Sequence, residues 1–121
     1  MGLDSNASQY LVLLGMKGEA LKGHLDLLLL AVIQRGPLHG YGVVERLRDH
    51  SGDAFALAEG TIYPALHRLE SSGVLTSRWS EIEGRRRRVY ELTARGILEL
   101  ARRREEWGAF SRAVSQVLEP A

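Results

Sequence analysis

The stretch EGTIYPALHRLESSGVLTSRW, residues 59–79, changes partway from a helical to a strand-like pattern. In its first half, apolar side chains recur at the three- and four-residue spacing that places them on one side of a helix. These residues are Ile62, Ala65, Leu66 and Leu69. Thr61 suits the helix N-cap, and Pro64 would then fall in the first turn, where the missing proline N–H costs no hydrogen bond. We therefore predict a helix over residues 61–72 and a strand over residues 74–79.

The residues downstream predict a β-hairpin followed by a long helix. Residues 87–92 have a second strand-like pattern, and Gly84 lies at the tip of the connecting residues 81–86. Thr93 suits the N-cap of a helix over residues 94–118, which ends before a proline. A hairpin of this size between two helices has the dimensions of a wing.

Two shorter helices are predicted upstream. Residues 23–35 are bounded by glycines and carry leucine on nearly every side, which indicates one face in the core and another against a second chain. Asp26 lies near the positive end of this helix's dipole. Residues 40–50, GYGVVERLRDH, are amphipathic. Three helices, a hairpin and a long helix follow the order of a winged helix-turn-helix, an α+β and mainly α fold whose third helix enters the DNA major groove.

We expect three parts in the chain. Residues 1–20 read as an N-terminal extension with at most one short helix, which is either a native arm that packs on a partner subunit or foreign to the natural protein. Residues 21–92 form the winged helix-turn-helix domain with a two-stranded β-wing. Residues 93–121 form a long C-terminal dimerisation helix.

Composition excludes several classes of protein. A chain of 121 residues is too short for a multidomain enzyme, and the absence of cysteine excludes disulfides, thiolate metal sites and cysteine nucleophiles. The apolar run over residues 27–33 is far shorter than the roughly 20 residues that cross a bilayer. No histidine pair has zinc-like spacing, and no nucleophile has an adjacent base. We expect a cytoplasmic protein with no membrane contact, no metal, no cofactor and no enzymatic activity.

The polar face of the predicted third helix could contact DNA. It carries Tyr63, Pro64, His67, Arg68 and Ser71, which lie opposite the apolar stripe. Arginine can donate two hydrogen bonds to guanine, and the histidine, tyrosine and serine side chains can reach bases or phosphates. The alternative is a solvated face of an amphipathic helix, which any small α+β domain could carry.

Basic residues are concentrated in one third of the chain although the net charge is only +1. Residues 78–104 contain nine arginines against four glutamates, and four of the arginines, Arg85, Arg86, Arg87 and Arg88, are consecutive near the predicted hairpin tip. Adjacent like charges repel unless a polyanion neutralises them, so we expect them to contact phosphate or the minor groove. A solubilising turn is the alternative. Trp79, on the first wing strand, is expected to pack at the wing base rather than to stack on bases.

Four stretches of the sequence resemble the PadR family of bacterial transcriptional regulators. They are LKGHLDLLLLAVI (21–33), GPLHGYGVVERL (36–47), EGTIYPALHRLESSGVLTSRW (59–79) and EGRRRRVYELTARG (83–96), and the match is densest from Gly60 to Glu70. The resemblance implies a winged-helix repressor that dimerises through its C-terminal helix, binds a palindromic operator and is released by a small effector. The single C-terminal helix resembles the shorter subgroup of the family. One departure is Val89, where members often carry an aromatic residue beside the position of Tyr90.

The resemblance also implies roles for individual residues. Thr61, Tyr63, Pro64 and His67 would contact DNA from the recognition helix, and Tyr41 from the start of the second helix. The wing arginines would contact the DNA backbone. Some similar regulators hold planar aromatic effectors between aromatic side chains at the dimer interface. Trp107 and Phe110, with Leu25 and Leu29 lining the site, are the candidates for such binding here, and simple interface packing is the alternative for Trp107.

The final helix indicates a homodimer independently of the resemblance. A first apolar patch of Ile97, Leu98 and Ala101 could be covered by the winged domain. A second stripe projects beyond that domain and would be exposed on a monomer. Its members are Trp107, Phe110, Val114, Val117 and Leu118. A second subunit is the simplest cover.

The sequence thus predicts a DNA-binding transcriptional regulator, with a winged-helix protein-interaction module as the alternative. Only the regulator predicts DNA binding whose logarithmic affinity falls linearly with the logarithm of the salt concentration, because each arginine–phosphate contact releases a counterion.

Overall fold

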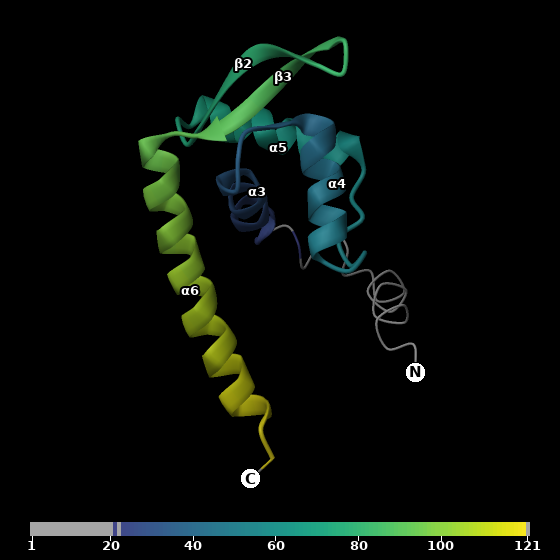
Figure 1. Cartoon of the computed structure of the whole chain (residues 1–121). Coiled ribbons are helices and arrows are strands. Elements are labelled where there is room, and N and C mark those ends of the chain that lie inside the picture. The colour runs from purple at the N-terminus through teal and green to yellow at the C-terminus, as the bar shows by residue number, and fades with distance from the viewer. Residues whose placement is uncertain (1–20, 22, 121) are drawn as a thin grey trace.

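The computed structural model describes residues 21 and 23–120, so the predicted extension over residues 1–20 lies outside the described residues. The helices are α3 (Leu25–Gln34), α4 (Gly40–His50), α5 (Glu59–Ser71) and α6 (Ala94–Leu118), and the strands are β1 (Leu38–His39), β2 (Leu75–Ile82) and β3 (Arg85–Leu92). Helices α3, α4 and α5 group beneath the β2–β3 hairpin, and α6 leaves the base of the hairpin and projects away from the group (Figure 1). The predicted fold class, a mainly helical winged helix-turn-helix with a β-wing and a long C-terminal helix, is confirmed.

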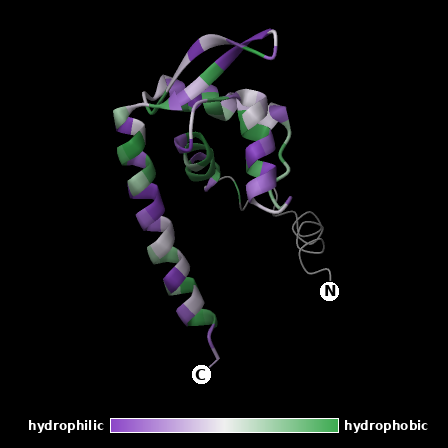
Figure 2. Cartoon of the chain, in the orientation of Figure 1, coloured by the Kyte–Doolittle hydropathy of each residue, from purple (hydrophilic) through white to green (hydrophobic). Residues whose placement is uncertain are grey.

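The core lies between the three grouped helices and the base of the sheet. Five side chains of these helices show no exposed surface, as does one of α6: Leu29, Leu30, Val43, Ile62 and Leu66, with Leu100 of α6. The sheet contributes Leu75 and Tyr90, each only 2% exposed. Figure 2 shows apolar and polar bands alternating along α4, the pattern of a helix that buries one face, whereas α3 is almost entirely apolar. The position of α5 is fixed by this core, so its opposite face is left to solvent.

Helix α5 begins two residues earlier than the sequence predicts. Its N-cap is Ala58, which has an extended backbone (φ −76°, ψ 154°) and no side-chain cap, so Thr61 lies inside the helix and is not the cap. Pro64 consequently lies in the helix interior rather than in the first turn. Because proline has no N–H, the carbonyl of Gly60 loses its helical partner, which is tolerable because Gly60 is exposed to water.

The wing is longer and its turn tighter than predicted. The strands β2 and β3 pair antiparallel as far as Ile82 and Arg85, so that only Glu83 and Gly84 form the turn. Both have positive φ, 53° and 74°, as a two-residue hairpin turn requires. The four consecutive arginines therefore lie on β3 rather than at a loop tip, with alternate side chains on opposite faces. A two-residue strand that was not predicted, β1, adds to the other edge of β3.

Helix α6 begins and ends where the sequence predicts. The Thr93 side chain accepts a hydrogen bond from the Gly96 N–H at 3.0 Å and donates one to the Gly73 carbonyl at 2.7 Å, which ties the start of α6 to the end of α5. The prediction that the winged domain covers Ile97 and Leu98 is wrong, because these side chains are 51% and 72% exposed. The contact is made instead by Gly96 and Leu100, both of which are buried.

The described part of the chain contains no helix long and apolar enough to cross a membrane.

Candidate nucleic-acid interface

The exposed face of α5 carries most of the residues predicted to contact DNA. Thr61, Pro64, His67 and Ser71 are exposed there, and Tyr63 is half-buried at its edge. Tyr41 lies in the first turn of the neighbouring helix α4 and is 42% exposed. The structure thus brings these six side chains to the α4–α5 side of the domain, as a helix-turn-helix reader requires.

Tyr63 joins the two helices at this surface. A Cβ atom at Gly40, the first residue of α4, would overlap the Tyr63 ring, so the glycine makes room for the tyrosine. Partial burial, and secondarily the nearby Glu59 carboxylate, raise the pKa of the Tyr63 hydroxyl. The hydroxyl therefore keeps its proton and can act as a hydrogen-bond donor.

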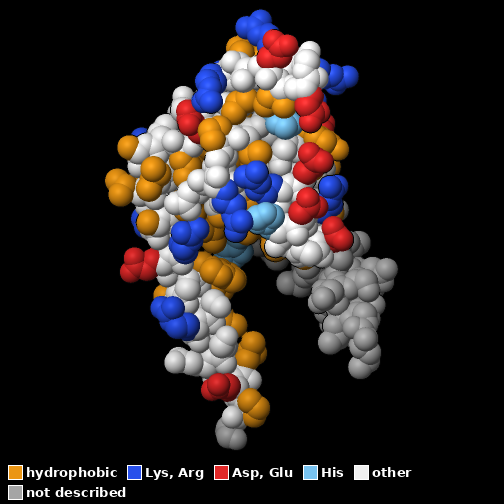
Figure 3. Space-filling model, in the orientation of Figure 1, with side chains coloured by type: hydrophobic (Ala, Val, Ile, Leu, Met, Phe, Trp, Pro, Cys, Tyr) orange, Lys and Arg blue, Asp and Glu red, His pale blue; other side chains and the backbone are white. Residues whose placement is uncertain are grey.

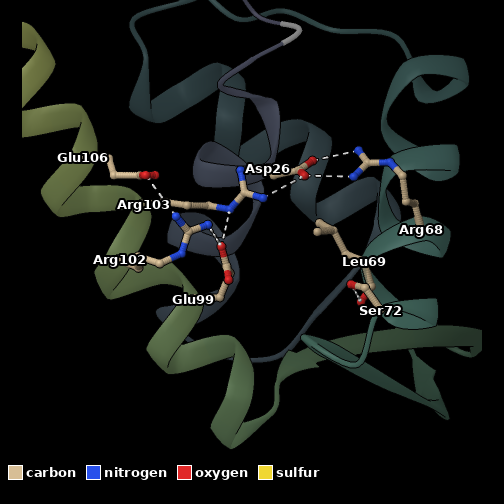
Figure 4. Close-up of polar contacts among 8 residues, drawn as sticks. All are labelled: Asp26, Arg68, Leu69, Ser72, Glu99, Arg102, Arg103 and Glu106. Atoms are coloured by element: carbon tan, nitrogen blue, oxygen red, sulfur yellow. Dashed lines mark hydrogen bonds and ion pairs between the residues drawn. The ribbon is translucent and has the colours of Figure 1, made fainter.

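Arg68 differs from the other predicted readers because its guanidinium is bound within the chain. Its two terminal nitrogens donate to the two carboxylate oxygens of Asp26, at 2.8 and 2.7 Å, and the Asp26 side chain is only 14% exposed (Figure 4). Arg103 of α6 approaches the same carboxylate at 3.5 Å. Figure 4 shows the three side chains converging from α5, α3 and α6. This geometry favours a structural role for Arg68 over the predicted contact with guanine.

The ionic cluster continues along α6. Arg103 donates from Nε to Glu99 at 2.9 Å, and Arg102 bonds both Glu99 and Glu106 (Figure 4). The sequence predicted for Asp26 only a favourable position near the positive end of a helix dipole, and did not predict its two arginine partners. Its partners lie 42 and 77 positions away in the chain, so no local pattern indicates them.

Replacing Asp26 with asparagine should destabilise the protein and change its response to acid. The Arg68 hydrogen bonds are the main cause that holds the pKa of Asp26 below its ordinary value of about 3.9. A carboxylate with a lowered folded-state pKa contributes stability above its unfolded pKa and loses it as the pH falls through the folded pKa. Because Arg68 stays more than half exposed, we expect Asp26→Asn to lower the unfolding free energy at pH 7 by about 1–2 kcal/mol.

Urea unfolding between pH 7 and pH 3 measures both effects. The difference between wild type and Asp26→Asn should shrink as the pH falls below about 4. Asp49→Asn is the matched control, because the Asp49 side chain is 67% exposed and contacts Arg48 only at 3.5 Å. An equal loss in both variants would contradict the role of the cluster.

The wing arginines are arranged around a tryptophan. The guanidinium carbons of Arg86 and Arg88 lie 5.2 and 5.4 Å from the centre of the Trp79 ring. Arg85 is exposed beside the turn, and Arg87 is half-buried, with a buried Nε that has no hydrogen-bond partner in the structure. Trp79 is 54% exposed, so the prediction that it packs at the wing base is wrong.

The residues proposed for dimerisation and effector binding lie far along α6. Phe110, Val114, Val117 and Leu118 are exposed on it and, with an alanine, line an open groove of about 260 Å³. The space-filling view shows apolar side chains following this helix away from the domain (Figure 3). This exposed stripe agrees with the sequence pattern.

A second cavity, of about 160 Å³, lies where α6 passes the start of α3. It is lined by Gly23, His24, Leu27, Arg103, Glu106, Trp107 and Phe110. The His24 ring meets the Trp107 ring edge-on, with 5.0 Å between their centres. Two predicted lining residues are corrected here: Leu29 is completely buried in the core, and Leu25 packs against the core outside this cavity.

The fold and the exposed face of α5 beside an arginine-bearing hairpin define a winged helix-turn-helix protein of the DNA-binding class. The comparison with known families agrees, since the model described as "Transcriptional regulator PadR-like family" matches residues 29–102. This chain belongs to that family, a family of transcriptional regulators and not of enzymes.

Relatives of this chain have been found in several bacteria. Transcriptional regulator Rv3488 of Mycobacterium tuberculosis is 36% identical over 77 residues, which cover 64% of this chain and 69% of the relative. The structure of a PadR-like transcriptional regulator from Bacillus cereus is 29% identical, with a TM-score of 0.76 over 85% of this chain and 99% of that one. A PadR family regulator from Eggerthella lenta is 31% identical, with a TM-score of 0.77 over 91% and 95% of the two chains.

Proposed function

We propose that the protein is a sequence-specific transcriptional repressor that acts in the cytoplasm and binds a palindromic operator as a homodimer. The observation that carries this proposal is the exposed face of α5, which projects polar side chains beside a wing with four consecutive arginines. In this arrangement α5 enters the major groove while the wing contacts the adjacent backbone. Thr61, Tyr63, Pro64, His67, Ser71 and Tyr41 contact bases or phosphates, and Arg68 supports the helix through Asp26.

The dimer forms through the apolar stripe of α6. A monomer would expose all of Trp107, Phe110, Val114, Val117 and Leu118, each of which is at least 38% exposed in the single chain. Pairing two such helices removes this surface from water. It also places the two α5 helices at a fixed separation, which must be close to one DNA turn, about 34 Å, for both half-sites to be bound together.

A planar aromatic effector is the proposed signal for release. The cavity between α6 and the start of α3 offers the Trp107, Phe110 and His24 rings, and a second subunit on α6 would enclose it further. Arg103 lines this cavity and also contacts Asp26, the partner of Arg68 on the recognition helix. A ligand that shifts α6 would therefore change the position of α5. An effector that binds here without changing operator affinity would contradict this mechanism.

Fluorescence anisotropy of labelled DNA tests the function. The probes are the duplex upstream of the protein's own coding sequence and a shuffled duplex of the same composition, each at two salt concentrations. We expect tight binding to the upstream duplex that weakens steeply with salt. Equal salt-sensitive binding to both duplexes would place the operator elsewhere. No binding to either duplex would overturn the proposal and favour a winged-helix protein-interaction module.

Variants of the wing and of α5 should affect binding differently. Arg86→Ala should weaken binding to operator and shuffled DNA alike and lower the salt slope by about one, because it removes one phosphate contact. His67→Ala should reduce the preference for the operator, by about 1–3 kcal/mol if it reads a base edge. Arg112→Ala, on the opposite face of α6 from the apolar stripe, removes one positive charge outside the proposed interface and is the control for the loss of charge alone. The same loss on both DNAs for Arg86→Ala and His67→Ala would refute this division of roles.

A further inference from the structure

Trp79 occupies an unusual position for a tryptophan. It lies on the same face of β2 as the buried Leu75, the face that packs against α5. At Trp79, however, the hairpin has extended past the core, and the indole is 54% exposed. Its cross-strand neighbour is Arg88, and Arg86 lies one pleat further along the same face. The described structure thus places an apolar ring on the surface next to two guanidinium groups.

This arrangement places two positive charges next to each other on one face of β3, although Glu81 is the cross-strand partner of Arg86. Arg86 and Arg88 are on the same face of β3, where their positive charges repel each other. Stacking on an aromatic ring uses the face of a guanidinium and leaves N–H donors at its edge free to bind a planar or tetrahedral anion. Arg88 donates its Nε–H to Ser77 at 2.8 Å, and one of its terminal nitrogens forms an ion pair with Glu70 at 3.6 Å, beyond direct hydrogen-bond distance. Its terminal N–H groups can therefore still donate to an anion. A partner with regularly spaced negative groups would satisfy both arginines.

The position of this cluster relative to α5 indicates which partner that is. A terminal nitrogen of Arg88 lies 3.6 Å from a carboxylate oxygen of Glu70, on the side of α5 that faces the wing. The exposed residues His67 and Ser71 lie on α5 beside Glu70, turned by less than a third of a helical turn around the helix axis. A duplex lying on these residues would therefore have its backbone beside Trp79.

We propose that Trp79 is a DNA-contacting residue, with its indole packed on a deoxyribose of the backbone while Arg86 and Arg88 bind the flanking phosphates. This inference rests on the proposed function and adds to it an apolar contact that carries no sequence information. A sugar offers the indole an apolar surface, and the two guanidinium groups next to the ring can bind the two phosphates that flank that sugar. The cluster Trp79–Arg86–Arg88 thus fixes the wing on the duplex while α5 reads the bases.

Tryptophan fluorescence tests the contact directly. The sequence has two tryptophans, Trp79 and Trp107, so wild type and Trp79→Phe are compared during titration with a short random-sequence duplex at low salt. We expect the duplex to quench the wild-type emission and to protect it from acrylamide, and both effects to be absent in Trp79→Phe. Anisotropy of the labelled duplex, recorded in parallel, reports binding itself. Unchanged wild-type emission while the anisotropy rises would overturn the proposal and leave the proposed function intact.

Affinity measurements supply a second test. Trp79→Ala should bind both upstream and random duplexes about ten-fold more weakly, the size of loss typical for removing an aromatic contact to a nucleotide. Thr76→Ala is the matched control, because Thr76 is exposed on the opposite face of the same strand. Equal affinities for Trp79→Ala and Thr76→Ala would contradict the contact. If no variant and not even the wild type binds DNA, the proposed function fails, and this inference fails with it.

Discussion

Val114→Asp should convert the proposed homodimer to a monomer and lower its affinity for the proposed palindromic operator at least 100-fold. Val114 lies in the middle of the apolar stripe of α6, one helical turn from Phe110 and less than one turn from Val117. A carboxylate placed there would be buried without a partner in the dimer, which costs several kcal/mol per subunit. Each monomer would then bind a single half-site and lose the gain from linking two sites, which is worth 10²–10⁴ in affinity.

Gln116→Asp provides the matched control for this prediction. Gln116 is exposed on the face of α6 opposite the stripe, so the same charge there should leave the dimer intact. Sedimentation velocity gives the oligomeric state, and fluorescence anisotropy gives the operator affinity. A dimeric Val114→Asp protein would place the interface elsewhere, for example on the exposed Ile97 and Leu98.

The helices of this protein could be predicted because their sequence signals are local. The apolar spacing from Ile62 to Leu69 places α5 and its buried side, and Thr93 indicates the start of α6 through a cap that the structure contains. The start of α5 could not be predicted in the same way. Ala58 caps the helix with backbone geometry alone, and nothing in its side chain distinguishes it from an interior residue.

The wing and the ionic cluster depend on contacts between residues far apart in the chain, which a local sequence pattern does not contain. Four consecutive arginines show no alternation of polar and apolar side chains, so β3 was predicted to begin at Arg87 although it begins at Arg85. Trp79, on the first wing strand, was predicted to pack at the wing base, and only the length of the hairpin relative to α5 shows that its face of β2 becomes exposed there. Asp26 has partners on two other helices, and pairings at such distances follow from the assembled fold.

Asp26 connects the two helices of the candidate site, a link that none of the separate sequence predictions contained. Helix α5, proposed to read DNA, and helix α6, proposed for dimerisation, bind the same carboxylate through Arg68 and Arg103. A movement of α6 is therefore opposed by bonds that also hold α5. Through Asp26, the ion pairs with Arg103 and Arg68 connect the proposed effector cavity to the proposed DNA-reading face.

Gly96→Ala should destabilise the protein by about 1–3 kcal/mol, because the added methyl group has no room. A Cβ atom at this position would overlap the carbonyl oxygen of Val74 and would lie 3.0 Å from its carbonyl carbon. That oxygen cannot move away freely, since it accepts the Thr93 N–H at 3.2 Å in the connection between the wing and α6. Relief would require α6 to separate from the domain and would also expose Leu100, which is completely buried.

Gly108→Ala, in the same helix, should have the opposite effect. A Cβ atom there would approach only the end of the flexible Arg112 side chain, at 3.2 Å. Replacing a helical glycine with alanine at such a position should stabilise the protein by about 0.5–1 kcal/mol. Urea unfolding of both variants at one fixed protein concentration measures the two changes, since dimer stability depends on concentration. Both substitutions replace a helical glycine with alanine, so a loss at Gly96 beside a gain at Gly108 would reflect the close packing of Gly96 on Val74 and Leu92. A stabilised Gly96→Ala protein would show that α6 does not pack against the wing base in this way.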